Sequence, residues 1–176
     1  MPAEIVVRPA PGPVHNGTVS WGARSVRCAL GRSGIMVDKK EGDGATPAGI
    51  FALRRVLYRP DRLTAPATRL PTEAINRDDG WCDDPIDPQY NRPVRLPYLG
   101  RHERMWREDG LYDVVVVMSH NDDPVVPGRG SAVFMHVART DFGPTEGCVA
   151  FARSDLLSIL AACDARAVIR IETAPT

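Results

Sequence analysis

The sequence predicts a mainly β domain that carries one C-terminal helix and a long proline-rich insert. Short runs of apolar and β-branched residues recur along the chain, each bounded by Gly, Pro or Asn, as is typical of strands. Residues 155–163 instead repeat apolar side chains at helical spacing. Residues 60–97 hold seven of the 16 prolines. Because proline removes backbone donors, no regular central strand or long helix is expected there.

The expected strands are short, and the clearest of them is residues 112–118. It contains four consecutive valines, and β-branched side chains favour a buried strand. The expected strands in chain order are residues 5–7, 26–30, 35–37, 49–58, 112–118, 131–138 and 168–171.

The strand at residues 131–138 has two distinct faces. Side chains alternate along a strand, so Phe134 and His136 are expected on one face and Val133 and Met135 on the other. The histidine therefore shares its face with an aromatic neighbour.

The helix at residues 155–163 is expected to begin after Ser154 as N-cap. Cys163 in this helical pattern, and Cys28 in a strand pattern, are expected to be small buried hydrophobes. The apolar stripe of the helix comprises Leu156, Leu157, Ile159 and Leu160.

Residues 59–98 are interpreted as a stiff cap. A structureless segment of this length is uncommon in a compact domain unless it covers a site or is disordered. Trp81 and Tyr90 argue against disorder, because disordered segments contain few aromatic residues. We expect the segment to cover the active-site cleft, with a surface excursion of no function as the alternative.

Length and composition limit the classes of function. The 176 residues suit a single domain, residues 1–176, and the net charge of zero gives no footprint for nucleic acid or an anionic membrane. No apolar run reaches the roughly 18 residues of a membrane span, and no secretory signal is seen in residues 1–13. The four cysteines show no C-x-x-C spacing, which disfavours zinc and redox motifs and leaves the disulfide state of Cys28, Cys82 and Cys163 open. No cofactor or metal is expected.

The candidate nucleophile is Cys148, and the candidate base is His136. A free thiol is mostly protonated at neutral pH, and a nearby imidazole can take its proton and hold the thiolate as an ion pair. Gly147 lets consecutive backbone N–H groups gather around one point, so the N–H groups of Gly147 and Cys148 are the expected oxyanion-hole donors. This pattern predicts cysteine acyl transfer, and two unrelated core residues are the alternative.

Other polar residues are candidates for binding the substrate. Arg139, three positions beyond His136, is expected to bind a carboxylate, with a solvated loop arginine as the alternative. Residues in the insert and at a strand end occupy places where a β scaffold delivers ligand contacts, although a histidine there can also be structural. These further candidates are Tyr90, Asn91, His120 and Asn121.

Three separated motifs resemble one known family. Residues 130–136, GSAVFMH, and 145–149, TEGCV, resemble the signature of the L,D-transpeptidase catalytic domain, also called YkuD, a family that cross-links bacterial peptidoglycan. Residues 42–51, GDGATPAGIF, are similar to its G-D-x-x-T-P-x-G-x-F turn and strand, and residues 112–121 followed by Pro124 resemble the strand that leads to the catalytic hairpin. The resemblance covers most of residues 31–152 and implies a β-sandwich of mixed sheets with a C-terminal helix at its edge. Thr145, in the second motif, is also expected to contact the substrate.

Two positions depart from the commonest form of the signature. Glu146 stands where the family usually has histidine, and Ala150 stands where it has arginine or asparagine. The interval between His136 and Cys148 is also short, so the chain resembles a divergent, short-loop branch. Branches of the family join stem peptides through 3-3 or 1-3 links, and both stay open.

The resemblance implies a peptidoglycan L,D-transpeptidase that acts through a cysteine thioester. The expected partners are stem peptides that contain diaminopimelate, and carbapenem-type inhibitors are expected to acylate Cys148. The family's substrate places the protein in the periplasm, in conflict with the unseen signal sequence. An L,D-carboxypeptidase or endopeptidase and a non-catalytic cell-wall-binding module are the alternatives.

Two other enzyme classes are weaker alternatives. A metal-dependent hydrolase would use His102, His120 and His136, but no H-E-x-x-H spacing is present, and His102 is expected on a solvated helical turn. A glycosidase would use the Asp pairs at 78–79, 83–84 and 122–123, although adjacent aspartates more often mark solvated turns.

Overall fold

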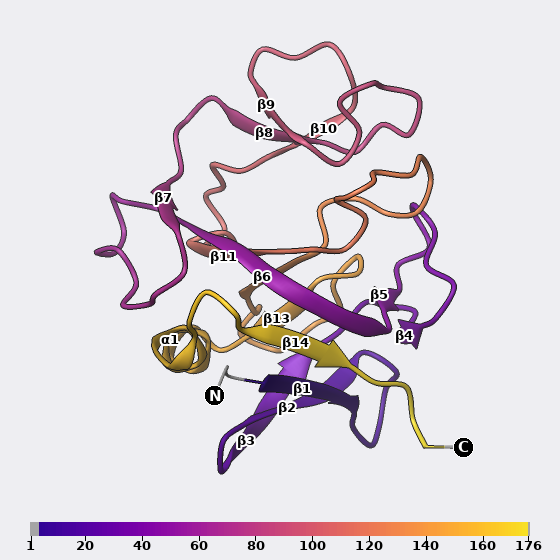
Figure 1. Ribbon diagram of the computed structural model, residues 1–176, viewed down its shortest axis with the longest axis vertical. Helices are drawn as coiled ribbons and strands as arrows, with labels where there is room; N and C mark the ends of the chain where they lie inside the picture. Colours follow the sequence, from indigo (N-terminus) through magenta and orange to yellow (C-terminus); the bar gives the residue numbers. More distant parts are fainter. Residues whose placement is uncertain (1–3, 176) are drawn as a thin grey trace.

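The computed structural model describes residues 4–175, so the ends of the predicted domain, residues 1–3 and 176, lie outside the described part. A nine-stranded sheet is the centre of the fold (Figure 1). Its strands are β1 (Glu4–Pro9), β2 (Asn16–Trp21), β3 (Arg24–Ala29), β6 (Gly49–Tyr58), β7 (Thr72–Ala74), β11 (Val114–Met118), β12 (Phe134–Val137), β13 (Val149–Phe151) and β14 (Val168–Ile171).

The large sheet closes on itself. Its strand order is β11-β12-β13-β3-β2-β1-β14-β6-β7, and β6 also pairs with β11. The strands from β11 to β6 therefore form a ring, and closure leaves few free strand edges. The pairs β1–β14, β12–β13 and β6–β7 are parallel and the others are antiparallel. The mainly β class with mixed sheets is confirmed, and the predicted sandwich takes the form of one closed sheet.

Several predicted strands agree with the structure in full or in part. The predicted residues 49–58 and 168–171 coincide with β6 and β14. The predicted residues 35–37 largely match β4 (Ile35–Met36), which pairs with β5 (Thr46–Pro47). The strand β2 was not expected because its turn-forming residues hide the alternation, and β13 was not expected because it has only three residues.

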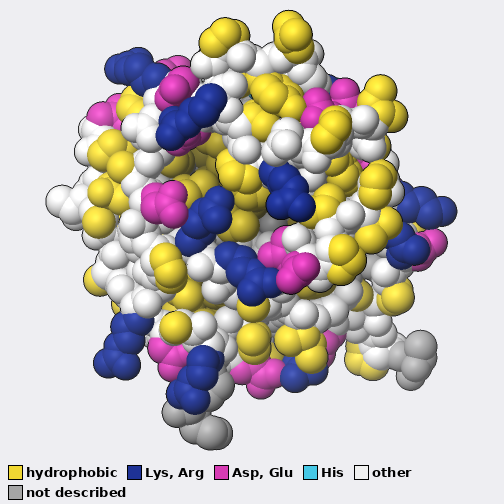
Figure 2. Space-filling view, turned by 45° about the horizontal axis from the view of Figure 1, so that its top comes forward, with side chains coloured by type: hydrophobic (Ala, Val, Ile, Leu, Met, Phe, Trp, Pro, Cys, Tyr) yellow, Lys and Arg dark blue, Asp and Glu magenta, His cyan; other side chains and the backbone are white. Residues whose placement is uncertain are grey.

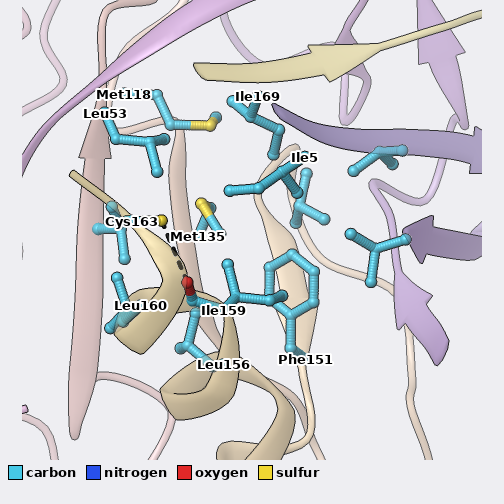
Figure 3. Close-up of a cluster of buried hydrophobic side chains, with 14 of the residues drawn as sticks. Ile5, Leu53, Met118, Met135, Phe151, Leu156, Ile159, Leu160, Cys163 and Ile169 are labelled. Atoms are coloured by element: carbon cyan, nitrogen blue, oxygen red, sulfur yellow. Dashed lines mark hydrogen bonds between the residues drawn. The ribbon is translucent and has the colours of Figure 1, made fainter. Parts of the chain in front are cut away.

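The main hydrophobic core fills the ring. The helix α1 (Arg153–Ala162) packs against this core, as Figure 3 shows. Leu156, Ile159 and Leu160 are fully buried, and each such side chain contributes roughly 1.5–3 kcal/mol through the area it removes from water. The predicted N-cap Ser154 is wrong. The N-cap is Ala152, which directly follows β13, and it makes no side-chain cap bond because alanine has no polar side-chain atom.

All four cysteines are buried and free. Cys163 follows α1, and its thiol donates a 3.2 Å hydrogen bond to the carbonyl of Ile159 (Figure 3). The predicted burial of Cys28 and Cys163 is confirmed. No helix in the described residues is long and apolar enough to pass through a bilayer.

The strand β12 separates two hydrophobic clusters, as its alternation predicts. Val133 and Met135 belong to the main core. Phe134 faces the other side, in a second cluster with Trp81, Tyr112 and Cys148. The candidate nucleophile therefore lies on the outer face of the ring.

The chain between β6 and β11, which contains the predicted insert, packs on this outer face through Ile75, Trp81 and Met105. The chain between β6 and β11 holds a three-stranded sheet of β8 (Asp79–Cys82), β9 (Pro93–Arg95) and β10 (His102–Arg104), at the top of Figure 1. The predicted insert, residues 59–98, is ordered, but its small sheet extends beyond residue 98. The predicted helical turn at His102 is wrong, because this residue pairs with Cys82 in the β10–β8 ladder.

Candidate active site

A cavity of about 460 Å³ lies between the outer face of the ring and the insert. Its walls include Cys148 and His136 from the ring side, and Glu103 and Arg107 from the insert side. Figure 2 views the molecule with the top of Figure 1 turned forward, and basic and acidic side chains are interspersed on this face. The cavity wall likewise carries both charges, among them Arg107 and Glu103, so it can hold a substrate that carries charges of both signs.

The parallel pair β12–β13 places the candidate nucleophile and the candidate base on the wall of one cavity. His136 in β12 is opposite Ala150 in β13, and Cys148 lies just before β13. The backbone N–H of Phe134 donates a 3.3 Å hydrogen bond to Cys148 Sγ, and the thiol donates a 3.2 Å bond to the carbonyl of Ala132. Cys148 and His136 retain only 8% and 6% exposure, and both face the cavity.

The resting pair is neutral. Burial raises the pKa of Cys148 to about 12, and the negative charge of Glu103 acts in the same direction. Burial also lowers the pKa of His136 to about 4, against the opposing hydrogen bond to Val137. The predicted thiolate–imidazolium ion pair is therefore not the resting state, because neither charge is compensated for its loss of water.

One hydrogen bond fixes the histidine tautomer. Nδ1 of His136 lies 2.9 Å from the carbonyl oxygen of Val137. A carbonyl can only accept, so Nδ1 carries the proton and Nε2 keeps its lone pair. His136 is therefore a neutral base whose free nitrogen can receive the thiol proton.

The turn before β13 is held by a threonine. The hydroxyl of Thr145 donates a 2.7 Å bond to the carbonyl of Cys148 and accepts a 3.1 Å bond from the N–H of Gly147. Gly147 has a φ of +142°, and a Cβ there would lie 2.7 Å from the carbonyl oxygen of Ala45. Only glycine fits this position without strain.

This turn changes two sequence-based expectations. The N–H of Gly147, an expected oxyanion donor, is already bonded to Thr145, whereas the N–H of Cys148 makes no hydrogen bond within residues 4–175. The backbone donor available to an oxyanion is therefore that of Cys148. Thr145 lines the cavity, but its hydroxyl shapes the turn.

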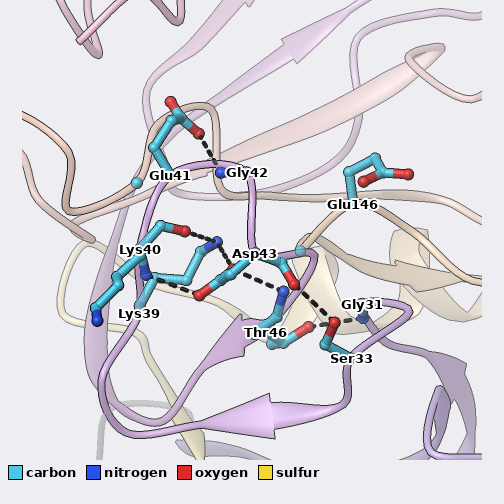
Figure 4. Close-up of polar contacts among 12 residues, drawn as sticks. Gly31, Ser33, Lys39, Lys40, Glu41, Gly42, Asp43, Thr46 and Glu146 are labelled. Atoms are coloured by element: carbon cyan, nitrogen blue, oxygen red, sulfur yellow. Dashed lines mark hydrogen bonds and ion pairs between the residues drawn. The ribbon is translucent and has the colours of Figure 1, made fainter.

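The motif at residues 42–51 supports the turn at Gly147 through a set of hydrogen bonds (Figure 4). The carboxylate of Asp43 accepts hydrogen bonds from the backbone N–H groups of Lys40 and Ala45 and pairs with Lys39. The hydroxyl of Thr46 accepts a 2.9 Å bond from the N–H of Gly31. These bonds fix the Ala45 carbonyl against Gly147 and bring Lys39 to the cavity wall.

Arg139 is one of the basic residues at the cavity. Its exposed side chain lines the cavity and forms no ion pair or hydrogen bond within the described part of the chain. Its guanidinium is therefore available to a carboxylate.

Tyr90 and Asn91 do not line the cavity, and both are buried. The hydroxyl of Tyr90 donates to Glu41 and accepts the N–H of Gly130, each at 3.0 Å. Asn91 is joined by hydrogen bonds to the side chain of one residue and the backbones of three. The expected substrate contacts are wrong, because the protein itself occupies these polar groups. The partners of Asn91 are Trp81, His120, Asn121 and Ala132.

His120 and Asn121 also lie outside the wall of this cavity. The imidazole of His120 donates a 3.0 Å bond to the carbonyl of Arg129, and burial lowers its pKa. The amide of Asn121 donates to the carbonyls of Val126 and Gly130. Both residues hold the loop before β12, so the expected substrate contacts are replaced by structural ones.

The tertiary structure adds residues to the cavity that the sequence analysis did not name as site candidates. Tyr112 packs edge-on against the ring of His136, with ring centroids 5.3 Å apart, and its hydroxyl donates a 2.7 Å bond to Glu103. Glu146, which departs from the usual signature, pairs with Arg32 at 3.0 Å. An isolated tyrosine and an acidic residue in an irregular stretch carry no local signal. Only the fold brings them to the cavity.

The alternative of a metal-dependent hydrolase required a cluster of ligands. Within residues 4–175, no three or more His, Cys, Asp or Glu side chains gather in a way that would hold a metal ion.

The comparison with family models agrees with the motif resemblance. A model of the YkuD family, described as the L,D-transpeptidase catalytic domain, matches residues 6–171. No curated protein matches the chain. Among solved structures, L,D-transpeptidase 1 of Mycobacterium tuberculosis is similar, with 14% identity and a TM-score of 0.39 over 96% of this chain. The chain spans 62% of the length of that solved protein.

Proposed function

Because the chain belongs to the L,D-transpeptidase catalytic domain family, we propose that it transfers acyl groups between peptidoglycan stem peptides through Cys148. The observation that carries the proposal is the shared cavity of Cys148 and His136, in which a neutral thiol faces a neutral imidazole. Such a pair can exchange a proton at the moment of attack.

The first step forms a thioester. Cys148 Sγ gives its proton to Nε2 of His136 as it attacks an amide carbonyl of the donor stem. The tetrahedral oxyanion is held by the N–H of Cys148, and loss of one such donor typically costs about 3 kcal/mol in the barrier. The carbon–nitrogen bond then breaks, and His136 returns the proton to the departing amine.

The second step releases the product. The side-chain amine of diaminopimelate in a neighbouring stem attacks the thioester carbonyl, and His136 takes a proton from the attacking nitrogen. The carbon–sulfur bond breaks, and the proton returns to Sγ. The resulting amide is a 3-3 or a 1-3 link, according to the donor residue that is acylated. We further propose the periplasm as the compartment, because peptidoglycan is cross-linked there.

Water competes with the amine for the thioester. Attack by water would make the same site an L,D-carboxypeptidase or endopeptidase. The chain between β6 and β11 contributes Asp83, Arg101, Glu103 and Arg107 to the cavity wall. Asp83 lies in the proline-rich residues 59–98 and the other three follow directly after them, which supports the interpretation of this part of the chain as a cap that limits access of water.

The proposal is tested with purified protein and disaccharide-tetrapeptide. Mass spectrometry is expected to detect a cross-linked dimer, and fragmentation locates the new amide. The variant Cys148→Ala is expected to form no dimer, and a carbapenem is expected to add its mass to the wild type alone. Conversion that persists in Cys148→Ala would refute the thioester mechanism. A wild type with neither adduct nor product would favour the non-catalytic wall-binding alternative.

A further inference from the structure

Glu103 is the acidic residue of the cavity wall whose carboxylate still has hydrogen-bonding positions for a charged partner. Its Oε1 accepts the hydroxyl of Tyr112 at 2.7 Å, and its side chain makes no other hydrogen bond and no ion pair within residues 4–175. A carboxylate has about four acceptor positions. Most of the hydrogen-bonding capacity of Glu103 is therefore unused.

The other acidic residues of the wall are occupied. Asp83 pairs with Arg101 at 3.1 Å, and Glu146 pairs with Arg32 at 3.0 Å. Glu41 accepts bonds from the hydroxyls of Tyr90 and Ser131 and from the N–H of Gly42.

The basic residues of the wall are also engaged, with one exception. Lys39 pairs with Asp43, and Arg107 pairs with Asp109. Arg139 alone among them forms no ion pair in the described residues. The cavity therefore presents one available carboxylate and one available guanidinium, which together match a ligand that bears an ammonium and a carboxylate.

Tyr112 places Glu103 on the same wall as the catalytic pair. Its hydroxyl bonds to Glu103, while its ring packs against His136. The charge of Glu103 also reaches Cys148, where it raises the pKa of the thiol. Glu103 thus opposes formation of the thiolate, so its presence beside the nucleophile has no advantage in the first half-reaction.

We propose that Glu103 binds the ammonium group of the acceptor and so selects a cationic amine for the second half-reaction. This inference rests on the proposed acyl transfer. The ammonium transfers one proton to the Glu103 carboxylate, which leaves a neutral amine. The amine attacks the thioester, the carbon–sulfur bond breaks, and His136 passes the second proton to Sγ. Glu103 then releases its proton to solvent.

The electrostatics of Glu103 suit this role. Burial raises the pKa of the carboxyl group, and the hydrogen bond from Tyr112 opposes that shift. A carboxylate with a raised pKa is a better proton acceptor for a bound ammonium. Tyr112 is a positioning residue, because it acts through Glu103.

The test separates the two half-reactions. The acyl-enzyme is formed with disaccharide-tetrapeptide, and its partition between hydrolysis and transfer is followed by mass spectrometry at increasing acceptor concentration. The acceptors are meso-diaminopimelate, which is cationic at its amines at neutral pH, and hydroxylamine, which is uncharged. Glu103→Gln is expected to raise the diaminopimelate concentration for half-maximal transfer by roughly tenfold or more. Transfer to hydroxylamine and the rate of acylation are expected to be retained.

Two further variants complete the experiment. Tyr112→Phe keeps the Glu103 carboxylate but removes its hydrogen bond. We expect a smaller loss in the use of diaminopimelate, with transfer to hydroxylamine retained. This variant tests the inference even if Glu103→Gln fails to fold. Glu108→Gln removes an exposed carboxylate of the same segment that pairs with Arg62 outside the cavity, and it is expected to behave as wild type. Equal losses with both acceptors, or unchanged use of diaminopimelate in Glu103→Gln, would overturn the inference while leaving acyl transfer in place. A wild type without an acyl-enzyme would instead refute the proposed function, and the inference with it.

Discussion

Phe134 and Cys148 are joined by a 3.3 Å hydrogen bond from the backbone N–H of the phenylalanine to the sulfur. The same strand carries His136 two residues later, so one backbone positions both the thiol and the base. This geometry leaves a neutral, buried thiol that is oriented before any substrate arrives.

Alkylation of Cys148 should depend strongly on pH. Since its pKa is raised to about 12, the reactive thiolate is scarce at neutral pH, and the rate of reaction with iodoacetamide should rise roughly tenfold per unit from pH 7 to pH 10. Peptide mapping by mass spectrometry assigns the adduct to Cys148, with Cys148→Ala as the control. A rate that is flat over this range would indicate a preformed ion pair.

His136 should make stability depend on pH. Its pKa falls from 6.5 to about 4 on folding, so the unfolded chain binds more protons between these values. The contribution to stability is complete above pH 6.5 and is lost as the pH falls toward 4, by roughly 3 kcal/mol. Urea unfolding of wild type and His136→Gln at pH 7 and pH 4 checks this. The variant should lose less stability on acidification, and identical losses would contradict the assigned neutral state.

Gly147→Ala should destabilise the site turn. The new Cβ meets the Ala45 carbonyl at 2.7 Å, and the φ of +142° is strained for alanine. We expect a loss of about 3 kcal/mol in the free energy of unfolding, together with a loss of acylation. Gly22→Ala is the matched control, since Gly22 has a φ of +55° but open space around it. It should cost about 1 kcal/mol, and a similar cost for both variants would show that the contact with Ala45 is not limiting.

Asn91→Ala should loosen the insert. The substitution removes the bonds to Trp81 and Ala132 and those to the carbonyls of His120 and Asn121. The Trp81 indole N–H and the Ala132 N–H would lose their shared acceptor. The expected cost is about 2–4 kcal/mol, with faster proteolysis in residues 76–100.

Gln89→Ala, at an exposed position nearby, is the control and should leave both measurements unchanged. A variant of Asn91 with normal stability but a weaker affinity for the donor peptide would restore the substrate-binding interpretation.

The sequence alone was sufficient to predict the features that depend on only a few neighbouring residues. The thiol, the glycine before it and the strand histidine follow from backbone geometry and side-chain chemistry within a few residues. The strands β6 and β14 were predicted in full because β-branched and apolar runs are bounded by clear turn residues. The start of α1 was not predicted correctly, because the helix begins directly after β13 and has no side-chain cap.

The roles of polar residues depended on distant partners. Asn91 bonds to Ala132, 41 residues away, and this contact makes it a structural residue. Glu103 faces Cys148 only because β10 pairs with β8 above the ring. No periodicity or spacing in the sequence encodes such distances.

The protonation of the catalytic pair was likewise decided by burial. Exposed groups would ionise without loss of hydration, but the closed ring and the chain that packs on it remove the imidazole and the thiol from water, which disfavours the ion pair that the sequence suggested. The sequence by itself determined the mainly β class, the family signature and the identity of the thiol and imidazole. The tertiary structure decided their charge state and their neighbours, because desolvation and long-range contacts arise only when the chain has packed.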